Sequence, residues 1–264
     1  GAPCDAPALR AIADAHGILL FEDGSQAHGA TLAGVRVGRF GHGAAFSCMG
    51  LKPLAGTEGG YALFADAAAA ERAMLHGRHP RGLPAERAAA LGADGLLDAL
   101  QLGWRPCAVG AALVRAALPR LDAENAARRR NLERLRAHLG DGCGIRIPPA
   151  PSRCEPVWHL LSLVVADPTR RGPIAERLAG MGVDTFHYIP VPIHRLRRLN
   201  PVGYDGPPVF WHAQLRRAGV DYRATACPQA EWRCPREITM GWNWVVDDEP
   251  AMAELAACFR AAAG

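Results

Sequence analysis

A short apolar run that follows a capped helix is the feature that most restricts the fold of this chain. Asp5 can cap a helix whose first turn holds Pro7, and Gly17 is suited to end that helix. The next residues, 18–21, are Ile-Leu-Leu-Phe and predict a strand buried on both faces of a parallel sheet. A helix followed by such a strand is one α/β repeat, so we expect an α/β fold with a mostly parallel sheet flanked by helices.

The residues that follow this predicted strand indicate a ligand site. Asp23 would lie just past the carboxyl end of the strand, which is the edge where open α/β sheets bind ligands. A buried carboxylate at that place needs a cationic partner, because otherwise it would take up a proton. The protonated nitrogen of a pyridine ring is such a partner, and pyridoxal phosphate supplies one.

Lysine is almost absent from this chain. Of 30 basic residues, Lys52 is the only lysine and all the others are arginines. A guanidinium stays protonated in proteins, whereas a desolvated lysine can lose its proton and attack a carbonyl as a neutral amine. Lys52 is therefore a candidate Schiff-base nucleophile, with chance retention in an arginine-rich composition as the alternative. Ser47 precedes it by five residues and is placed to give a hydroxyl to a cofactor phosphate.

Together these segments resemble the DegT/StrS family of sugar aminotransferases, fold-type I enzymes that use pyridoxal phosphate. The Asp-x-x-Gln-x-His-Gly motif of that family is matched by residues 23–29, and its Ser-x-x-x-x-Lys motif by residues 47–52. Weaker matches extend the resemblance over nearly the whole chain. They are Glu58-Gly59-Gly60, Arg105, the helical stretch 121–128, residues 186–190 with His194, and residues 227–231.

The resemblance implies a role for each matched residue. Lys52 would bind the cofactor covalently and move protons at the substrate carbon, while Asp23 would pair with the pyridine nitrogen. Gln26 would border the ring and its phenolic oxygen, and Ser47 would bind the phosphate. Three residues would lie towards the substrate: His187, Tyr188 and His194.

The resemblance also implies a reaction and an assembly. The complete protein would pass an amino group from glutamate or glutamine to a keto sugar or keto cyclitol, and it would be a homodimer. Such a reaction belongs to the biosynthesis of secondary metabolites or cell-surface sugars. Dehydratases of the family carry a histidine in place of the lysine, so Lys52 argues against that branch. Two alternatives stay open: a non-catalytic homologue or partner subunit of the same fold, and an elimination enzyme that uses the same cofactor.

Two features depart from the pattern of the family. The chain begins with Gly1 at a point that the family reaches only after roughly its N-terminal third. We therefore expect a fragment, or a processed or split chain, without the loop that cradles the phosphate. Gly103 stands two residues before Arg105, where many relatives have an asparagine. The phosphate contact that a neighbouring subunit makes in those relatives is not supported at that position.

Proline in a helix interior breaks the helix, and Pro119 interrupts a helical region predicted over residues 107–139. The sequence therefore predicts two domains: residues 1–120, the C-terminal part of a large cofactor-binding domain, and residues 121–264, a small α+β domain. Within the second, strands are predicted over residues 157–165 and 183–188 with a helix over 170–181 between them. His159 is expected to be an interior or edge histidine of the first of these strands.

Composition restricts the partners. A formal charge of +4 is too small to imply nucleic acid, and a charged fraction of 21% is ordinary for a soluble protein. The sequence shows neither an apolar run of membrane-spanning length nor a signal peptide, so we expect a cytoplasmic protein without a membrane partner. A zinc site made by Cys227, Cys234 and His212 is a weaker alternative to reduced thiols and no metal.

Overall fold

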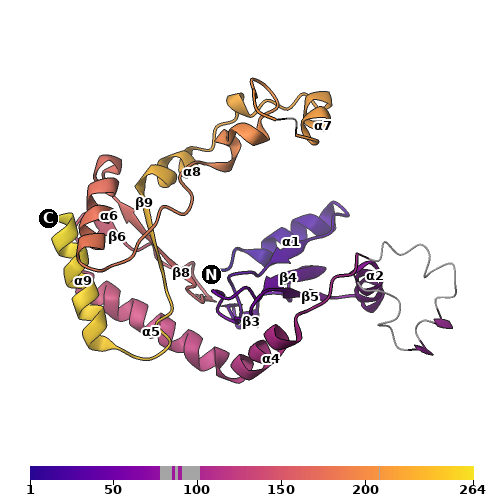
Figure 1. Ribbon diagram of the computed structural model, residues 1–264, viewed down its shortest axis with the longest axis horizontal. Coiled ribbons are helices and arrows are strands. Elements are labelled where there is room, and N and C mark those ends of the chain that lie inside the picture. The colour runs from indigo at the N-terminus through magenta and orange to yellow at the C-terminus, as the bar shows by residue number, and fades with distance from the viewer. Residues whose placement is uncertain (78–84, 87–88, 91–101, 208) are drawn as a thin grey trace. The chain divides into compact units, whose positions relative to one another are not determined.

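The computed structural model describes residues 1–77, 85–86, 89–90, 102–207 and 209–264 (Figure 1). The chain forms two compact units that are interleaved along the sequence. The first consists of Gly1–Arg130, Ala150–His159 and Asn243–Asp247, and the second of Asn131–Pro149, Leu160–Trp242 and Asp248–Gly264. Two domains were predicted over residues 1–120 and 121–264. Their bounds differ from those of the two units, and the division into domains stays a prediction.

The first unit begins with the predicted helix. Helix α1 spans Ala6–Ala15, and the Asp5 carboxylate caps it by accepting a hydrogen bond from the Ala8 N–H at 3.2 Å. Gly17 follows the helix with φ +62°, a conformation that costs glycine little. The capped start and the glycine end of this helix are therefore confirmed.

A three-stranded sheet with the order β1-β4-β5 forms the centre of the first unit. Its strands are β1 (Phe21–Asp23), β4 (Gly43–Ser47) and β5 (Gly60–Phe64). β1 runs parallel to β4, whereas β5 is antiparallel to β4. The parallel pairing was predicted, but burial of residues 18–21 on both faces was wrong. The strand begins only at Phe21, and Ile18 and Phe21 are 61% and 58% exposed; β1 is one of the two edge strands of this sheet.

A small second sheet and further helical segments lie in the described residues of the first unit. The sheet has the order β3-β2-β7, with β2 at Thr31–Leu32, β3 at Val35–Arg36 and β7 at Cys154–Glu155. Helix α2 (Ala67–Gly77) is followed later by α4 (Ala108–Ala117), the 3-10 turn η2 (Leu118–Arg120) and α5 (Leu121–Leu139). The predicted interruption at Pro119 is thus confirmed as a 3-10 turn between two helices. α5 starts in the first unit and ends in the second.

The second unit is built on an antiparallel sheet with the order β6-β8-β9. Its strands are β6 (Ile145–Arg146), β8 (Leu160–Val165) and β9 (Glu237–Gly241). Helix α6 (Arg171–Gly180) packs against α9 (Glu249–Ala263) and β9, and α9 also contacts β6. The core of this unit is mostly apolar, with Asn131 and Thr239 as buried polar residues, and its best-buried apolar side chains include Leu132, Leu135, Leu161, Leu163, Leu178, Ile238, Met252 and Phe259.

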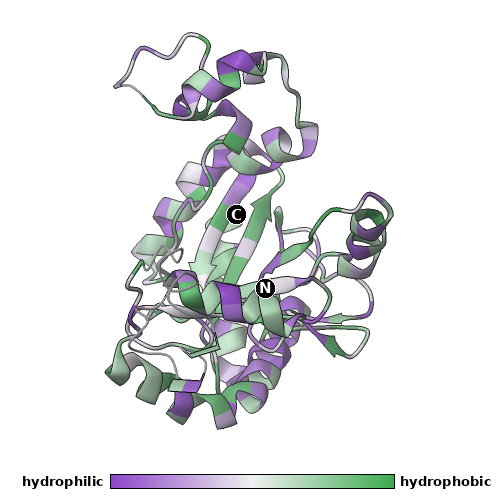
Figure 2. Cartoon of the chain, turned by 90° about the vertical axis from the view of Figure 1, so that its right-hand side faces the viewer, coloured by the Kyte–Doolittle hydropathy of each residue, from purple (hydrophilic) through white to green (hydrophobic). Residues whose placement is uncertain are grey.

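A long, mostly irregular segment joins α6 to β9. The strand predicted over residues 183–188 was wrong, because only one bridge, between Phe186 and Thr239, connects this stretch to the sheet. Short helices and single helical turns follow, and hydrophilic and hydrophobic colours alternate along this segment in the upper part of Figure 2. The helical pieces of the second unit outside α6 and α9 are η3 (Pro168–Arg170), η4 (Ile193–Arg195), η5 (Arg197–Leu199), α7 (His212–Arg217), η6 (Tyr222–Ala224), α8 (Pro228–Arg233) and η7 (Cys234–Arg236).

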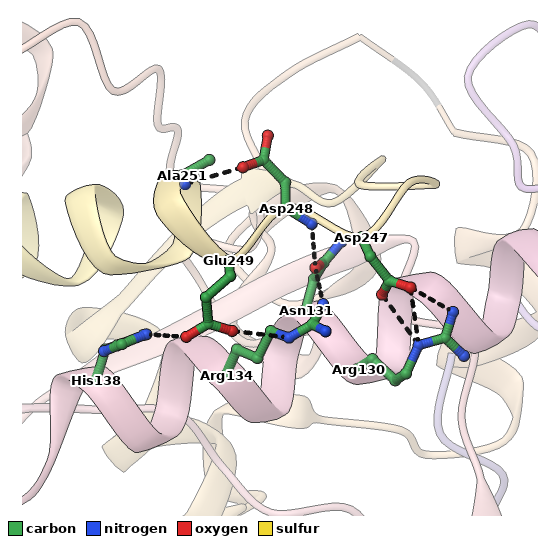
Figure 3. A network of polar contacts seen from close by, with 8 residues as sticks. All are labelled: Arg130, Asn131, Arg134, His138, Asp247, Asp248, Glu249 and Ala251. Atoms are coloured by element: carbon green, nitrogen blue, oxygen red, sulfur yellow. Dashed lines mark hydrogen bonds and ion pairs between the residues drawn. The ribbon is translucent and has the colours of Figure 1, made fainter.

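Polar contacts fix the start of α9 in the second unit (Figure 3). Asn131 accepts a hydrogen bond from the Asp248 N–H at 3.0 Å, and Asp248 caps α9 through the Ala251 N–H. Glu249 pairs with Arg134 at 2.8 Å and with His138 at 2.5 Å, both on α5. These groups hold α5 and α9 together within the unit. Among the residues that the structure describes, no helix has the length and apolar character needed to cross a membrane.

Candidate active site

The ends of two parallel strands bring the predicted site residues of the first unit together. Because β1 and β4 are parallel, their carboxyl ends lie at the same edge of the sheet. Asp23 pairs with Ala45 in the register, and the Gly24 N–H donates to the Ala45 carbonyl at 2.8 Å. Ser47 is therefore only two residues beyond the partner of Asp23, and Lys52 follows on the loop that leaves β4.

Asp23 is exposed, which corrects the expectation of a buried carboxylate. The edge position of β1 leaves the side chain accessible in the described part of the chain. Its Oδ1 accepts hydrogen bonds from the Ser25 hydroxyl at 2.5 Å and the Ser25 N–H at 3.0 Å. These bonds, with a smaller contribution from Lys52, lower the pKa of Asp23 below its ordinary value. Asp23 is thus an ionised acceptor, as pairing with a cationic ring nitrogen requires.

Lys52 lies on a loop between β4 and β5 whose two arms are held by backbone hydrogen bonds. The Cys48 N–H donates to the Gly59 carbonyl at 2.8 Å, and the Gly56 N–H donates to the Cys48 carbonyl at 2.8 Å. The Lys52 N–H closes a turn onto the Met49 carbonyl at 2.8 Å, and the following Pro53 is buried. These contacts fix the backbone that carries the half-buried Lys52 side chain.

Ser47 and Gln26 are both half-buried at this edge of the sheet. The Ser47 Oγ accepts a hydrogen bond from the Met49 N–H at 3.3 Å, so its own hydroxyl proton remains a donor. Gln26 stands in the turn after β1, three residues beyond Asp23. Their roles towards a ring oxygen and a phosphate stay predictions.

An aromatic cluster lies beneath the two loops and fixes them to each other. The Phe46 and Tyr61 rings stack with centroids 4.9 Å apart, and His28 lies 5.2 Å from Phe46 and 6.0 Å from Tyr61. Gly24 must remain a glycine here, because a Cβ at that position would come within 2.3 Å of the Phe46 ring. Phe46 therefore contacts the loop of Asp23 from the strand that carries Ser47.

His28 is the buried polar group of this cluster. Its side chain is 1% exposed, and neither ring nitrogen has a hydrogen-bond partner among the described residues. Burial, with a smaller contribution from the Lys52 charge, lowers the pKa of His28 from 6.5 to about 4. The imidazole is consequently neutral at pH 7. The sequence places His28 in the matched motif but does not indicate this burial.

His159 is a neighbour of Lys52 that sequence reasoning did not assign to the site. It is half-buried at the end of the first unit, one residue before β8. Burial and then the Lys52 charge lower its pKa to about 4, and His28 and Arg128 also contribute. The sequence predicted an interior or edge histidine but not an effect of Lys52 on His159, because no signal near His159 in the sequence indicates it.

The pKa of His28 predicts acid sensitivity of the fold. The unfolded chain binds a proton at His28 below pH 6.5, whereas the folded chain binds it only near pH 4, so the free energy of unfolding falls as the pH falls through this window. We expect a loss of about 2 kcal/mol between pH 7 and pH 5 from this residue. Urea unfolding of the wild type and of His28→Phe measures it. Equal pH dependence in the two proteins would contradict the assignment.

The three predicted substrate residues lie in the second unit. His187 contacts the Cys234 carbonyl through Nε2 at 2.7 Å, and Tyr188 is 51% exposed. His194 contacts the Glu231 carboxylate at 2.7 Å and its side chain is 10% exposed. His187 and His194 are thus oriented by neighbours of their own unit. Their role towards a substrate stays a prediction.

The zinc alternative gains no support from the described residues, which contain no group of three or more His, Cys, Asp or Glu side chains placed to hold a metal ion. His212 is buried and contacts the Arg198 carbonyl through Nε2 at 2.7 Å. Arg105, one of the weaker matches to the family, is exposed in the segment before α4.

Comparison with protein families gives one match over residues 1–251, to the DegT/DnrJ/EryC1/StrS aminotransferase family. The chain is 35% identical over 198 residues to the erythromycin biosynthesis sensory transduction protein EryC1 of Saccharopolyspora erythraea, covering 74% of this chain and 50% of that protein. It is 34% identical to the dTDP-3-amino-3,4,6-trideoxy-alpha-D-glucose transaminase of Streptomyces venezuelae (74% and 48% covered). It is 31% identical to the L-glutamine:2-deoxy-scyllo-inosose aminotransferase of Streptomyces fradiae (98% and 62% covered). The chain spans about half the length of the first two.

Solved structures share the fold. S. venezuelae DesV, crystallised with a ketimine intermediate, superposes with a TM-score of 0.75 at 26% identity, over 99% of this chain and 62% of that one. A 3-amino-5-hydroxybenzoic acid synthase gives a TM-score of 0.75 at 23% identity, over 99% of this chain and 65% of that one. These similarities confirm the predicted α/β fold class.

Proposed function

The chain belongs to the DegT/DnrJ/EryC1/StrS aminotransferase family, and from that premise we propose that it carries the lysine site of an aminotransferase that uses pyridoxal phosphate. The observation that carries this proposal is the parallel register of β1 and β4. It places Asp23, an ionised carboxylate, at the edge of the sheet where β4 ends and the loop of Lys52 begins. A covalent amine and a carboxylate for the ring nitrogen are the two groups that this cofactor needs from the protein.

The residues at this edge fit the cofactor. Lys52 would hold its aldehyde carbon, and the Asp23 carboxylate would accept a hydrogen bond from the ring nitrogen. Gln26 would border the ring oxygen, and the Ser47 hydroxyl would donate to the phosphate. The buried aromatic cluster would keep these loops fixed, and the neutral His28 would add no charge beneath them.

When bound, pyridoxal phosphate withdraws electrons from the substrate carbon and so allows an amino group to pass between two molecules. The part of this chain is to move protons. As a neutral amine, Lys52 would take the proton from the α-carbon of the amino donor and return a proton during transfer to the acceptor. Asp23 would remain ionised throughout and so keep the ring nitrogen protonated.

The acceptor would be a keto sugar or keto cyclitol, and the amino donor glutamate or glutamine. Relatives with named activities support this choice, because they include a dTDP-sugar transaminase and L-glutamine:2-deoxy-scyllo-inosose aminotransferases. His187, Tyr188 and His194 would lie towards the acceptor. The complete protein would be a cytoplasmic homodimer in the biosynthesis of an antibiotic or a cell-surface sugar.

Covalent trapping tests the proposal. After addition of pyridoxal phosphate and reduction with borohydride, we expect one pyridoxyl group on the peptide that contains Lys52. Since Lys52 is the only lysine of this chain, peptide mapping separates it cleanly from the terminal amine. Label on the terminal amine alone, or no label in a folded protein, would rule the proposal out.

A matched pair of carboxylates tests the ring contact in the same assay. Asp23→Asn should weaken cofactor binding by at least roughly tenfold, because a hydrogen bond to a charged group is lost. Asp14→Asn removes another exposed carboxylate of the first unit, which pairs with Arg10 on α1. This control should bind the cofactor as the wild type does.

A further inference from the structure

Arg128 is a buried arginine of the first unit to which the proposed function assigns no part. It lies on α5 and is 3% exposed. Burial lowers the pKa of its guanidinium below the ordinary value, while the charge of Glu124 acts in the opposite direction. The charge persists nevertheless, because a guanidinium keeps its proton in proteins. A buried charge is costly unless its donors are well placed, so the groups that Arg128 contacts indicate what it is for.

Two asparagine side chains accept hydrogen bonds from this guanidinium. Nη1 donates to Asn125 Oδ1 at 2.8 Å, and Nη2 donates to Asn243 Oδ1, also at 2.8 Å. Asn125 is 1% exposed and precedes Arg128 by three residues on α5. Asn243 belongs to the late segment of the first unit and is 115 residues away in sequence. Arg128 therefore fixes two amides at once, one on its own helix and one on a distant segment.

Arg128 determines which way the Asn125 amide faces. Because a guanidinium only donates hydrogen bonds, the amide oxygen must face Arg128 and the amide nitrogen must face away from it. That nitrogen donates to the His28 carbonyl at 2.9 Å, in a buried hydrogen bond. In the reversed orientation, two donors would meet at Arg128 and two acceptors would meet at His28. Arg128 thus fixes a hydrogen bond in which it takes no part itself.

The His28 carbonyl lies near the end of the loop 23–29, which carries Asp23 and Gln26. A backbone hydrogen bond of 2.8 Å holds the start of this loop to β4. Near its end, the Asn125 amide holds the loop to α5, beside the aromatic contacts of the His28 ring. The place of Asp23 and Gln26 relative to β4 therefore depends on attachments at both ends of the loop, and Arg128 secures the attachment to α5.

We propose that Arg128 is a positioning residue for the cofactor, acting through Asn125 on the loop that carries Asp23. The inference rests on the proposed function and deepens it, because it names the group that keeps the carboxylate opposite the ring nitrogen. Functional side chains must stay within about 0.5 Å of their working geometry, and supporting residues with fixed hydrogen bonds provide this. Arg128 itself would touch neither the cofactor nor the substrate.

Two forms of the cofactor distinguish positioning of Asp23 from a general structural role. Pyridoxal phosphate and its 1-deaza analogue differ only at the ring nitrogen, the atom that Asp23 would contact. In calorimetric titrations the wild type should bind pyridoxal phosphate at least roughly tenfold more tightly, because the analogue offers no hydrogen bond to the carboxylate. A wild type without this preference would overturn the inference, since there would be no contact for Arg128 to position.

A matched pair of variants changes the contacts of the same guanidinium in two ways. Asn125→Asp keeps an acceptor for Arg128 but cannot donate to the His28 carbonyl. Its preference for pyridoxal phosphate should fall below about threefold, while its affinity for the analogue stays within about threefold of the wild type. Asn243→Asp places the same charge beside the same guanidinium without touching the loop, so it should keep the full preference. Equal losses of affinity for both compounds in Asn125→Asp would show a structural role and overturn the proposal.

Arg128→Met removes the guanidinium and tests the positioning residue directly. Its preference should also fall below about threefold. Hydrogen exchange of the protein without cofactor gives an independent readout. Amides of the loop 23–29 should exchange at least roughly tenfold faster in Arg128→Met and Asn125→Asp than in Asn243→Asp. Should circular dichroism show that Arg128→Met does not fold, the asparagine pair decides. Unchanged exchange together with unchanged preference would overturn the role of Arg128.

The result can be separated from the proposed function, because borohydride trapping at Lys52 does not depend on the ring nitrogen. A labelled wild type whose preference survives in both Arg128→Met and Asn125→Asp would overturn the role of Arg128 alone. Absence of label in a folded wild type would overturn the proposed function, and this inference with it.

Discussion

Replacing Lys52 with arginine should lower the rate of amino transfer by roughly 10⁴-fold while the fold is retained. The guanidinium keeps the positive charge, but it stays protonated and can neither bond to the cofactor nor accept a proton from carbon. Single-turnover measurement with glutamine as the donor gives the rate. An arginine variant that retained more than a hundredth of the wild-type rate would show that another group moves the proton.

The control for this variant is its stability. Lys52 is half-buried on a loop held by backbone hydrogen bonds, so Lys52→Arg should shift the free energy of unfolding by less than about 1 kcal/mol. In Lys52→Ala, a small added amine should restore part of the rate, because it replaces the missing base. A loss of rate accompanied by unfolding would not count as support.

Alanine at Gly29 is expected to destabilise the first unit by about 2–4 kcal/mol. Gly29 has φ +84°, and a Cβ there would come within 2.8 Å of Asn125 Nδ2. That nitrogen donates to the His28 carbonyl at 2.9 Å, so the substitution combines backbone strain with the loss of a buried hydrogen bond. Urea unfolding at pH 7 measures the effect.

Gly34 provides the matched control. It has φ +80°, but a Cβ would meet no atom within 4 Å. Gly34→Ala should therefore cost only the backbone strain, about 1–2 kcal/mol. If both variants lost the same stability, the contact between Gly29 and Asn125 would carry no weight in holding the loop of His28.

Local signals in the sequence predicted several elements correctly. The Asp5 cap and the interruption at Pro119 each depend on a few neighbouring residues, so the sequence alone is sufficient for them. Leu132, Leu135 and Leu139 repeat at helical spacing, and the structure buries all three as the pattern indicates.

Predictions that depended on distant partners fared less well. The predicted burial of residues 18–21 was wrong because burial depends on the segments that cover the faces of the sheet, which these residues do not encode. Residues 183–188 have strand-like composition, yet only Phe186 forms a bridge to β9, and a strand requires consecutive pairs. Both errors concern contacts between segments far apart in sequence.

The candidate site shows the same difference between local signals and contacts that join distant segments. Asp23, Gln26, Ser47 and Lys52 could be selected because their motifs are contiguous, and the pairing of β1 with β4 brings them to one edge. The proximity of His159 to Lys52 could not be foreseen, because only the tertiary structure brings the two segments together.

The interleaving of the two units has a consequence for biosynthesis on the ribosome. β7 pairs with β2, and Asp247 pairs with Arg130 at 2.9 Å, so the first unit needs residues from late in the translated sequence. It cannot be completed until residue 247 has left the exit tunnel, by which time most of the second unit has already emerged. Synthesis of most of the second unit therefore precedes completion of the first, and a fragment that stops after Arg130 would lack two segments of its own unit.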